Sequence, residues 1–211
     1  MEKRNIEITL ETAREWYNSN IVLRDIALQV FDEKELKYSF KDIKTFEDAI
    51  KVLGYNKVAI NNIIRDINCY SKASAAMFKL NIVRKALNLG QDLHLTKSPK
   101  DSCIYYPFNP FVTEDSTYYK REINAGKMEI IGKFKNEEII YNVLNKPDYT
   151  SDYGLGRFDS KNGVGYANAN FGLFGCTSKE IAQHFGKYFG MLITEAKYGD
   201  LPDFQIVGSK Y

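Results

Sequence analysis

Apolar residues in the first thirty positions recur at the three- and four-residue spacing of amphipathic helices. After a short polar-apolar start, the segments ETAREWYN and IVLRDIALQVF both carry this pattern. The polar run Asn18-Ser19-Asn20 between them favours a break. The pattern therefore predicts two short helices or one kinked helix.

Local start and stop signals define the next helices. Thr45 stands three residues before Asp48, and Gly54 ends the apolar run that follows, which predicts an N-cap, a helix and a C-terminal stop. From Lys57 to Leu89 the helical period continues, with a break expected near Tyr70. These residues are predicted to form a helical hairpin or a bent pair of helices.

The pattern changes after residue 90. From Gln91 to Gly126 periodicity is lost, prolines punctuate an aromatic segment, and a surface connector is predicted. The segments KMEIIGKFK and EIIYNVL predict two strands joined by a turn at Asn136-Glu137. A second hairpin is predicted around Asn162-Gly163, because this dipeptide suits a two-residue turn with positive φ.

The last helix is predicted from a capping box, in which Thr177 accepts from the amide of Glu180. An apolar stripe follows. Beside it, Ala182, Gly186 and Gly190 recur at four-residue spacing and form a second ridge that has almost no side-chain atoms. Glycine within a helix costs about 1 kcal/mol relative to alanine, so close packing of another backbone is expected there. The residues after Gly199 are expected to add a short strand or to remain loose. The stripe consists of Ile181, Phe185, Tyr188, Phe189, Leu192 and Ala196.

This order of elements predicts an α+β fold. The N-terminal half is helical, and the C-terminal half consists of antiparallel β-hairpins covered by a C-terminal helix. Residues 1–98 are expected to form a helical lobe and residues 99–211 the sheet with its helix, either as two lobes or as one continuous domain.

Charge and hydropathy exclude several classes of partner. The formal charge of the 211 residues is +2, from 29 basic and 27 acidic side chains, so no strong field attracts nucleic acid or anionic lipid. No run approaches the roughly 18 apolar residues that span a bilayer, and the N-terminus lacks the apolar stretch of a secretory signal. A cytoplasmic protein without membrane contact is expected.

No recognisable pattern supplies catalysis or a metal site. The three cysteines are scattered outside any C-x-x-C arrangement, and are expected to be reduced, mostly buried thiols. His94 falls in the connector and His184 beside the stripe of the last helix, where structural or solvated roles are expected. Acid pairs such as Glu114-Asp115 and Glu137-Glu138 are typical of solvated turns. The sequence thus predicts no enzyme activity, cofactor or metal.

A binding surface is predicted on the second hairpin. Its strand directs alternate side chains to opposite faces, and tyrosine with asparagine is typical of adaptable contact surfaces. The alternative is a glycine-rich strand pair whose small residues permit close packing. The candidate binding residues are Arg157, Tyr166, Asn168, Asn170 and Phe171.

Several segments resemble proteins carried by tailed phages and prophages of gut Bacteroidales, crAss-like phages included. The resemblance rests on Tyr105-Tyr106-Pro107, on a glycine- and aromatic-rich stretch, and on a helix of the form Ser-x-Glu-hydrophobic-Ala followed by Gly-Lys-x-Phe. The resemblance implies a phage origin and supplies no activity or catalytic residue. The helix positions that match are Ser178, Glu180, Ile181, Ala182, Gly186, Lys187 and Phe189.

Together these patterns predict a non-enzymatic virion component or binding module. Its hairpin would contact a protein partner, a second copy of the chain or a glycan. An intracellular phage accessory protein that binds a nucleotide or a host defence protein is the alternative.

Overall fold

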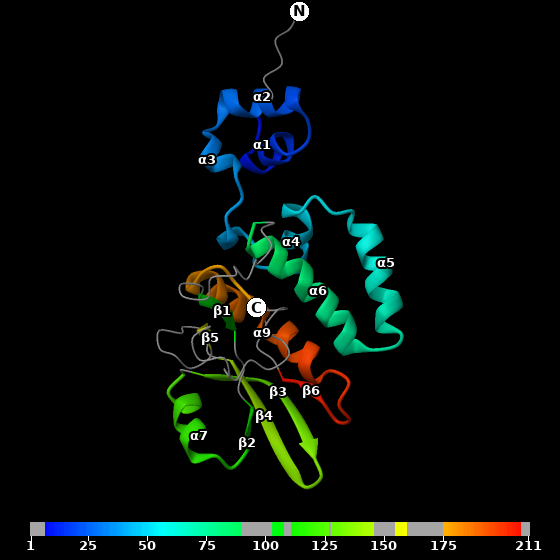
Figure 1. Cartoon of the computed structure of the whole chain (residues 1–211), viewed down its shortest axis with the longest axis vertical. Helices are drawn as coiled ribbons and strands as arrows, with labels where there is room; N and C mark the ends of the chain where they lie inside the picture. The colour runs from blue at the N-terminus through cyan, green and yellow to red at the C-terminus, as the bar shows by residue number, and fades with distance from the viewer. Residues whose placement is uncertain are drawn as a thin grey trace, which may run out of the picture.

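The structure is a computed structural model that describes residues 7–89, 103–107, 111–126, 128–145, 155–159 and 175–207. Helices precede antiparallel strands, and a long helix lies near the C-terminus, so the predicted α+β class is confirmed (Figure 1). The helices are α1 (Leu10–Tyr17), α2 (Ile21–Val30), α3 (Glu33–Leu36), the 3-10 helix η1 (Phe40–Asp42), α4 (Phe46–Val52), α5 (Lys57–Asn68), α6 (Lys72–Leu87), α7 (Thr117–Asn124) and α9 (Lys179–Tyr198). The strands are β1 (Cys103–Pro107), β2 (Phe111–Thr113), β3 (Glu129–Asn136), β4 (Ile139–Asn145), β5 (Leu155–Asp159) and β6 (Gln205–Ile206).

Side-chain caps set the starts of the N-terminal helices. The Thr9 hydroxyl accepts from the amide of Thr12 at 3.2 Å, and the Asn20 side chain accepts from the amide of Leu23 at 3.0 Å. Each cap satisfies an amide that has no partner within its helix. The expected break at residues 18–20 is therefore a boundary between two separate helices.

The N-cap predicted at Thr45 is present, and it forms part of a capping box. Thr45 accepts from the amide of Asp48 at 3.1 Å, and the Asp48 carboxylate accepts from the amide of Thr45 at 2.8 Å. Gly54, just after the helix, has a φ of +66°, which a glycine adopts without steric cost. The predicted break in the next helical run is confirmed too, because Ser71 caps α6.

Two antiparallel sheets occupy the described part of the C-terminal half. One pairs β1 with β5, and the other has the order β2-β4-β3-β6. The predicted β3–β4 hairpin is present, but Asn136 pairs with Ile139, so the turn is Glu137-Glu138, one residue later than expected. The tail supplies the short strand β6, which pairs with β3.

The predicted connector from Gln91 to Gly126 was wrong in its described part, which contains β1, β2 and α7. Strand β1 has no alternating pattern, and it pairs with β5, about fifty residues further along the chain. Such pairing depends on tertiary contacts that a local pattern does not reveal.

The N-terminus of α9 also differs from the prediction. Ser178, not Thr177, is the N-cap, and its hydroxyl accepts from the amide of Ile181 at 3.2 Å. The prediction of Thr177 was wrong: the capping-box spacing favoured Thr177 because Glu180 follows it by three residues, but Ser178 can also cap a helix and does so one residue later. The predicted stripe faces the interior, where Phe185 and Phe189 are buried.

One apolar core joins α4 and α6 to α9. It includes Ile50, Leu80, Val83 and Phe185. Asn88, just after α6, is buried beside this core. Its side-chain Nδ2 donates to the carbonyl oxygen of Gly175, and its side-chain Oδ1 accepts from the amide of Thr177. The chain that enters α9 is thereby fixed to α6. The domain boundary expected near residue 98 lies outside the described residues and stays a prediction.

Helix α9 also lies against the four-stranded sheet, as predicted (Figure 1). The ring of Phe134 on β3 stacks on Tyr198 of α9 with centroids 5.4 Å apart. Gly132 on β3 brings its strand close to Thr194, which is fully buried. Of the predicted small-residue ridge, Ala182 and Gly190 are buried and Gly186 is half-buried.

Candidate docking surface on the N-terminal head

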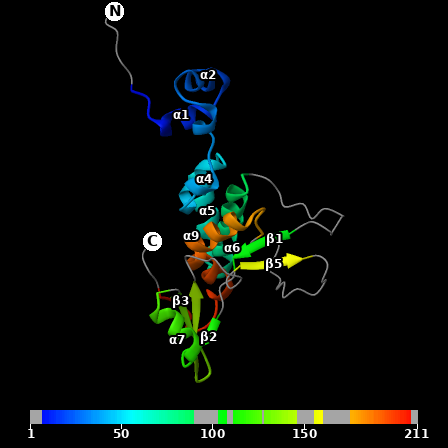
Figure 2. The same ribbon diagram turned by 90° about the vertical axis from the view of Figure 1, so that its left-hand side faces the viewer.

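Residues 7–38, which contain α1 to α3, form a small unit that we call the head; the remaining described residues form the body. The head stands at one end of the molecule (Figures 1 and 2). Its own core consists of Ala13, Ala27 and Leu36, and it is separate from the core of the body. The head therefore has its own apolar interior.

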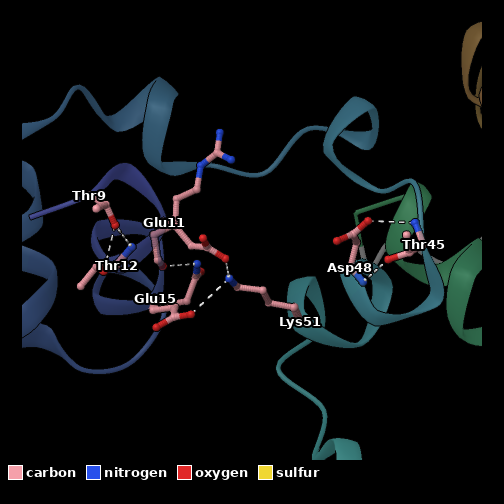
Figure 3. Close-up of polar contacts among 9 residues, drawn as sticks. Thr9, Glu11, Thr12, Glu15, Thr45, Asp48 and Lys51 are labelled. Carbon is pink, nitrogen blue, oxygen red and sulfur yellow. Dashed lines mark hydrogen bonds and ion pairs between the residues drawn. The ribbon is translucent and has the colours of Figure 1, made fainter.

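Polar side chains connect the head to the body. Lys51 of α4 forms ion pairs with Glu11 and with Glu15 of α1, the second at 3.1 Å (Figure 3). Arg14 lies 3.7 Å from the Asp42 carboxylate and donates from Nε to the carbonyl oxygen of Glu35 at 2.8 Å. We call these ion pairs of Lys51 and Arg14 the ionic clasp.

A cleft of about 370 Å³ lies beside the clasp, between α1 and α4. Tyr38 lines it, and burial raises the pKa of this phenol. The hydrogen bond between Lys51 and Glu11 raises the pKa of the lysine and lowers that of the carboxyl group. The charged side chains of the ion pairs beside this cleft neutralise one another. We therefore interpret the cleft as a contact between the head and the body, and not as a binding site for a charged ligand.

Helix α2 exposes most of its apolar side chains. Seven of its ten residues are apolar, yet Ala27 alone among them is buried. Val22, Ile26 and Val30 follow one side at four-residue spacing and are 65%, 37% and 57% exposed. Ile21 and Leu28, also exposed, lie on another side of the same helix. We call these five residues the α2 surface.

A polar network holds α2 in its orientation. The guanidinium group of Arg24 lies over the ring of Tyr17, 4.6 Å from its centroid, and donates to the phenol oxygen at 3.2 Å. That phenol donates to the Glu33 carboxylate at 2.9 Å. Hydrogen bonds from Lys37 and Tyr17 lower the pKa of Glu33. This network links α2, through Arg24, to Tyr17 of α1 and Glu33 of α3, so the helix that presents the α2 surface is held in place.

A second hollow, an open groove of about 690 Å³, runs beside β2 and β4. The carboxylates of Glu114, Asp115 and Glu138 line it, with a single basic side chain, Lys120. Glu114 pairs with Lys133 at 3.2 Å, and a hydrogen bond from Thr113 lowers the pKa of Asp115. Such a lining repels phosphate groups.

Reactive side chains do not assemble into a recognisable catalytic site among the described residues. Burial raises the pKa of the Cys176 thiol, which keeps it protonated and unreactive. Burial lowers the pKa of Lys197 to about 8, so most of this amine is protonated at neutral pH. Cys69, the C-cap residue of α5, is exposed and Cys176 is buried. The side chain of Cys103 lies outside the described part of the structure, so the expectation of mostly buried thiols stays a prediction. In the described ranges, no three histidine, cysteine or acidic side chains gather as a metal site.

His184 has a structural contact, as expected. Its Nε2 lies 2.7 Å from the carbonyl oxygen of Ile43, and its ring packs edge-on against Phe40. Burial lowers the pKa of this imidazole, and the charges of Lys44 and Lys187 lower it further, against the effect of the hydrogen bond.

This lowered pKa predicts a pH-dependent stability. As pH falls through the ordinary histidine pKa of about 6.5, the unfolded chain binds a proton that the folded chain resists, so stability is lost. The substitution His184→Gln keeps a donor for Ile43 and removes the titration. Urea unfolding at about pH 7.5 and about pH 5.5 should show a smaller loss of stability in the variant than in the parent chain. Equal losses would contradict a role for His184.

Most of the predicted hairpin surface lies outside the described residues. Tyr166, Asn168, Asn170 and Phe171 lie outside the described residues. The backbone of Arg157 lies in β5, where it pairs with Tyr105 of β1. The hairpin surface therefore stays a prediction.

The apolar residues of α2 predicted a helix, but their exposure was not predicted. A signal was present, because IVLRDIALQV is apolar on nearly every side. Three short helices have too little interior to cover such a helix, so part of its apolar surface had to remain in solvent.

Comparison with protein-family models, curated proteins and solved structures found no match. Among the described residues, no helix is both long and apolar enough to cross a membrane.

Proposed function

We propose that this chain is a non-enzymatic, phage-encoded virion component that binds another protein through its head. The observation that carries the proposal is the exposure of the α2 surface. Extended apolar surface on a folded protein marks an interaction site more often than chance exposure does. Apolar residues at four-residue spacing also suit helix-in-groove recognition, in which one face of a helix enters an apolar groove.

The phage origin is supported by the resemblance around Tyr105-Tyr106-Pro107 and in α9. The hairpin around Tyr166 to Phe171 is proposed as a second contact, with a protein or a glycan, on the basis of its composition. The two surfaces lie in different parts of the sequence, so one chain would contact two neighbours.

Mass spectrometry of purified particles tests the proposal. Particles of the phage that carries the gene should contain the chain at a fixed copy number relative to the major capsid protein. If the chain is absent from particles but abundant in infected cells, the virion proposal fails and an intracellular accessory role replaces it.

For that accessory role, neither of the two hollows lined by described residues favours a nucleotide as ligand. Of the two hollows, the groove is lined mainly by carboxylates, and the cleft has charges that already pair with one another. A host protein would use the same α2 surface, so the particle experiment separates the two roles.

A further inference from the structure

Helix α5 is the second helix with extensive exposure of apolar side chains. Ile60 packs against the core of the body, and none of the twelve residues of α5 is fully buried. Val58 is 70% exposed, Ile63 is 43% exposed, and Tyr70, just beyond the helix, is 93% exposed. We call Val58, Ile63 and Tyr70 the α5 surface.

The α2 and α5 surfaces lie in regions of opposite charge. The head, residues 7–38, has seven acidic and four basic side chains. Residues 57–89, which contain α5 and α6, have six basic side chains and one acidic side chain, Asp66. The net charges of the two regions are therefore opposite in sign, although Lys51 of the body already pairs with two acids of the head, Glu11 and Glu15.

The two surfaces lie apart in one molecule. Helix α2 is on the side of the head away from the body, whereas α5 runs along the outer side of α6 (Figure 1). A contact between them would therefore join two copies of the chain. A contact of α2 with α2 would instead bring two acidic heads together, and like charges oppose such a contact.

We propose that the chain self-associates by docking the α2 surface of one copy on the α5 surface of the next. This inference rests on the proposed function and names a second copy as the partner of the head. A head-to-side contact uses two different patches, so it repeats from copy to copy and builds a ring or an open filament. Such repetition suits a component of a particle.

Two matched variants test this geometry. Val22→Asp places a charge in the α2 surface, and Val58→Asp places one in the α5 surface; both side chains are mostly exposed, so the fold should be retained. Sedimentation velocity of the full chain should show oligomers that grow with protein concentration and weaken with salt. Each variant alone should remain monomeric.

The mixture of the two variants gives the decisive result. The Val22→Asp variant keeps an intact α5 surface, and the Val58→Asp variant keeps an intact α2 surface. An equal mixture should therefore form dimers, and it should form no larger oligomers because the two surfaces that remain in each dimer are the altered ones. A parent chain that is monomeric at every concentration, a variant that still forms oligomers, or a mixture without dimers would overturn the inference. The measurement uses purified chain, so its failure is distinct from absence of the protein from particles.

Discussion

Replacing Gly132 by alanine should destabilise the fold by about 1–3 kcal/mol, the usual cost of overpacking a filled site. A Cβ atom on Gly132 would lie 2.9 Å from Cγ2 of Thr194 and 3.1 Å from the ring of Phe204. Thr194 has little freedom to move, because it is fully buried and its hydroxyl donates to the carbonyl oxygen of Gly190 at 2.9 Å. The free energy of unfolding, from urea denaturation, measures the effect.

The substitution Thr194→Ser provides the control. Serine keeps the hydroxyl that bonds to Gly190 and removes the methyl group that alanine at position 132 would meet. The double variant should therefore be more stable than the sum of the single effects predicts, by at least about 0.5 kcal/mol. Additive effects would show that the close approach of β3 and α9 does not limit the size of residue 132.

Features whose signals lie close together in the sequence were predictable. The helices that begin with their own caps, such as α4 with Thr45 and Asp48, were predictable because the signals lie within a few residues of the helix. The β3–β4 hairpin was predictable for the same reason, apart from a shift of one residue in its turn.

Features that depend on distant residues were not predictable. Strand β1 forms only because β5 lies beside it. Asn88 links α6 to the start of α9 only because residues 175–177 lie beside it in the folded chain. The α2 surface depends on what the rest of the chain leaves uncovered. A local pattern identifies a helix, but its exposure follows from the volume of the surrounding core.

The joint between head and body has a functional meaning if the head is the docking unit. A rigid head would fix the angle between neighbouring molecules, whereas a head held by ion pairs can turn to meet its partner. Exposed ion pairs contribute little stability and are screened by salt. The ionic clasp therefore holds the head weakly, and small changes in charge should release it.

Replacing Lys51 by glutamate should release the head from the body. The new carboxylate would face Glu11 and Glu15, so attraction is replaced by repulsion. The segment between α3 and α4 should then be cleaved several-fold faster by trypsin, which has sites there at Lys37, Lys41 and Lys44.

Lys135→Glu is the matched control, because it makes the same change of charge at an exposed side chain of β3, a strand far from the head (Figure 1). It should leave the cleavage rate unchanged. In the parent chain, higher salt should accelerate cleavage by screening the clasp, and the uncharged variant Lys51→Met should lose this dependence. If Lys51→Glu is cleaved no faster than the control, contacts other than the ionic clasp hold the head, and the head would present the α2 surface at one fixed angle.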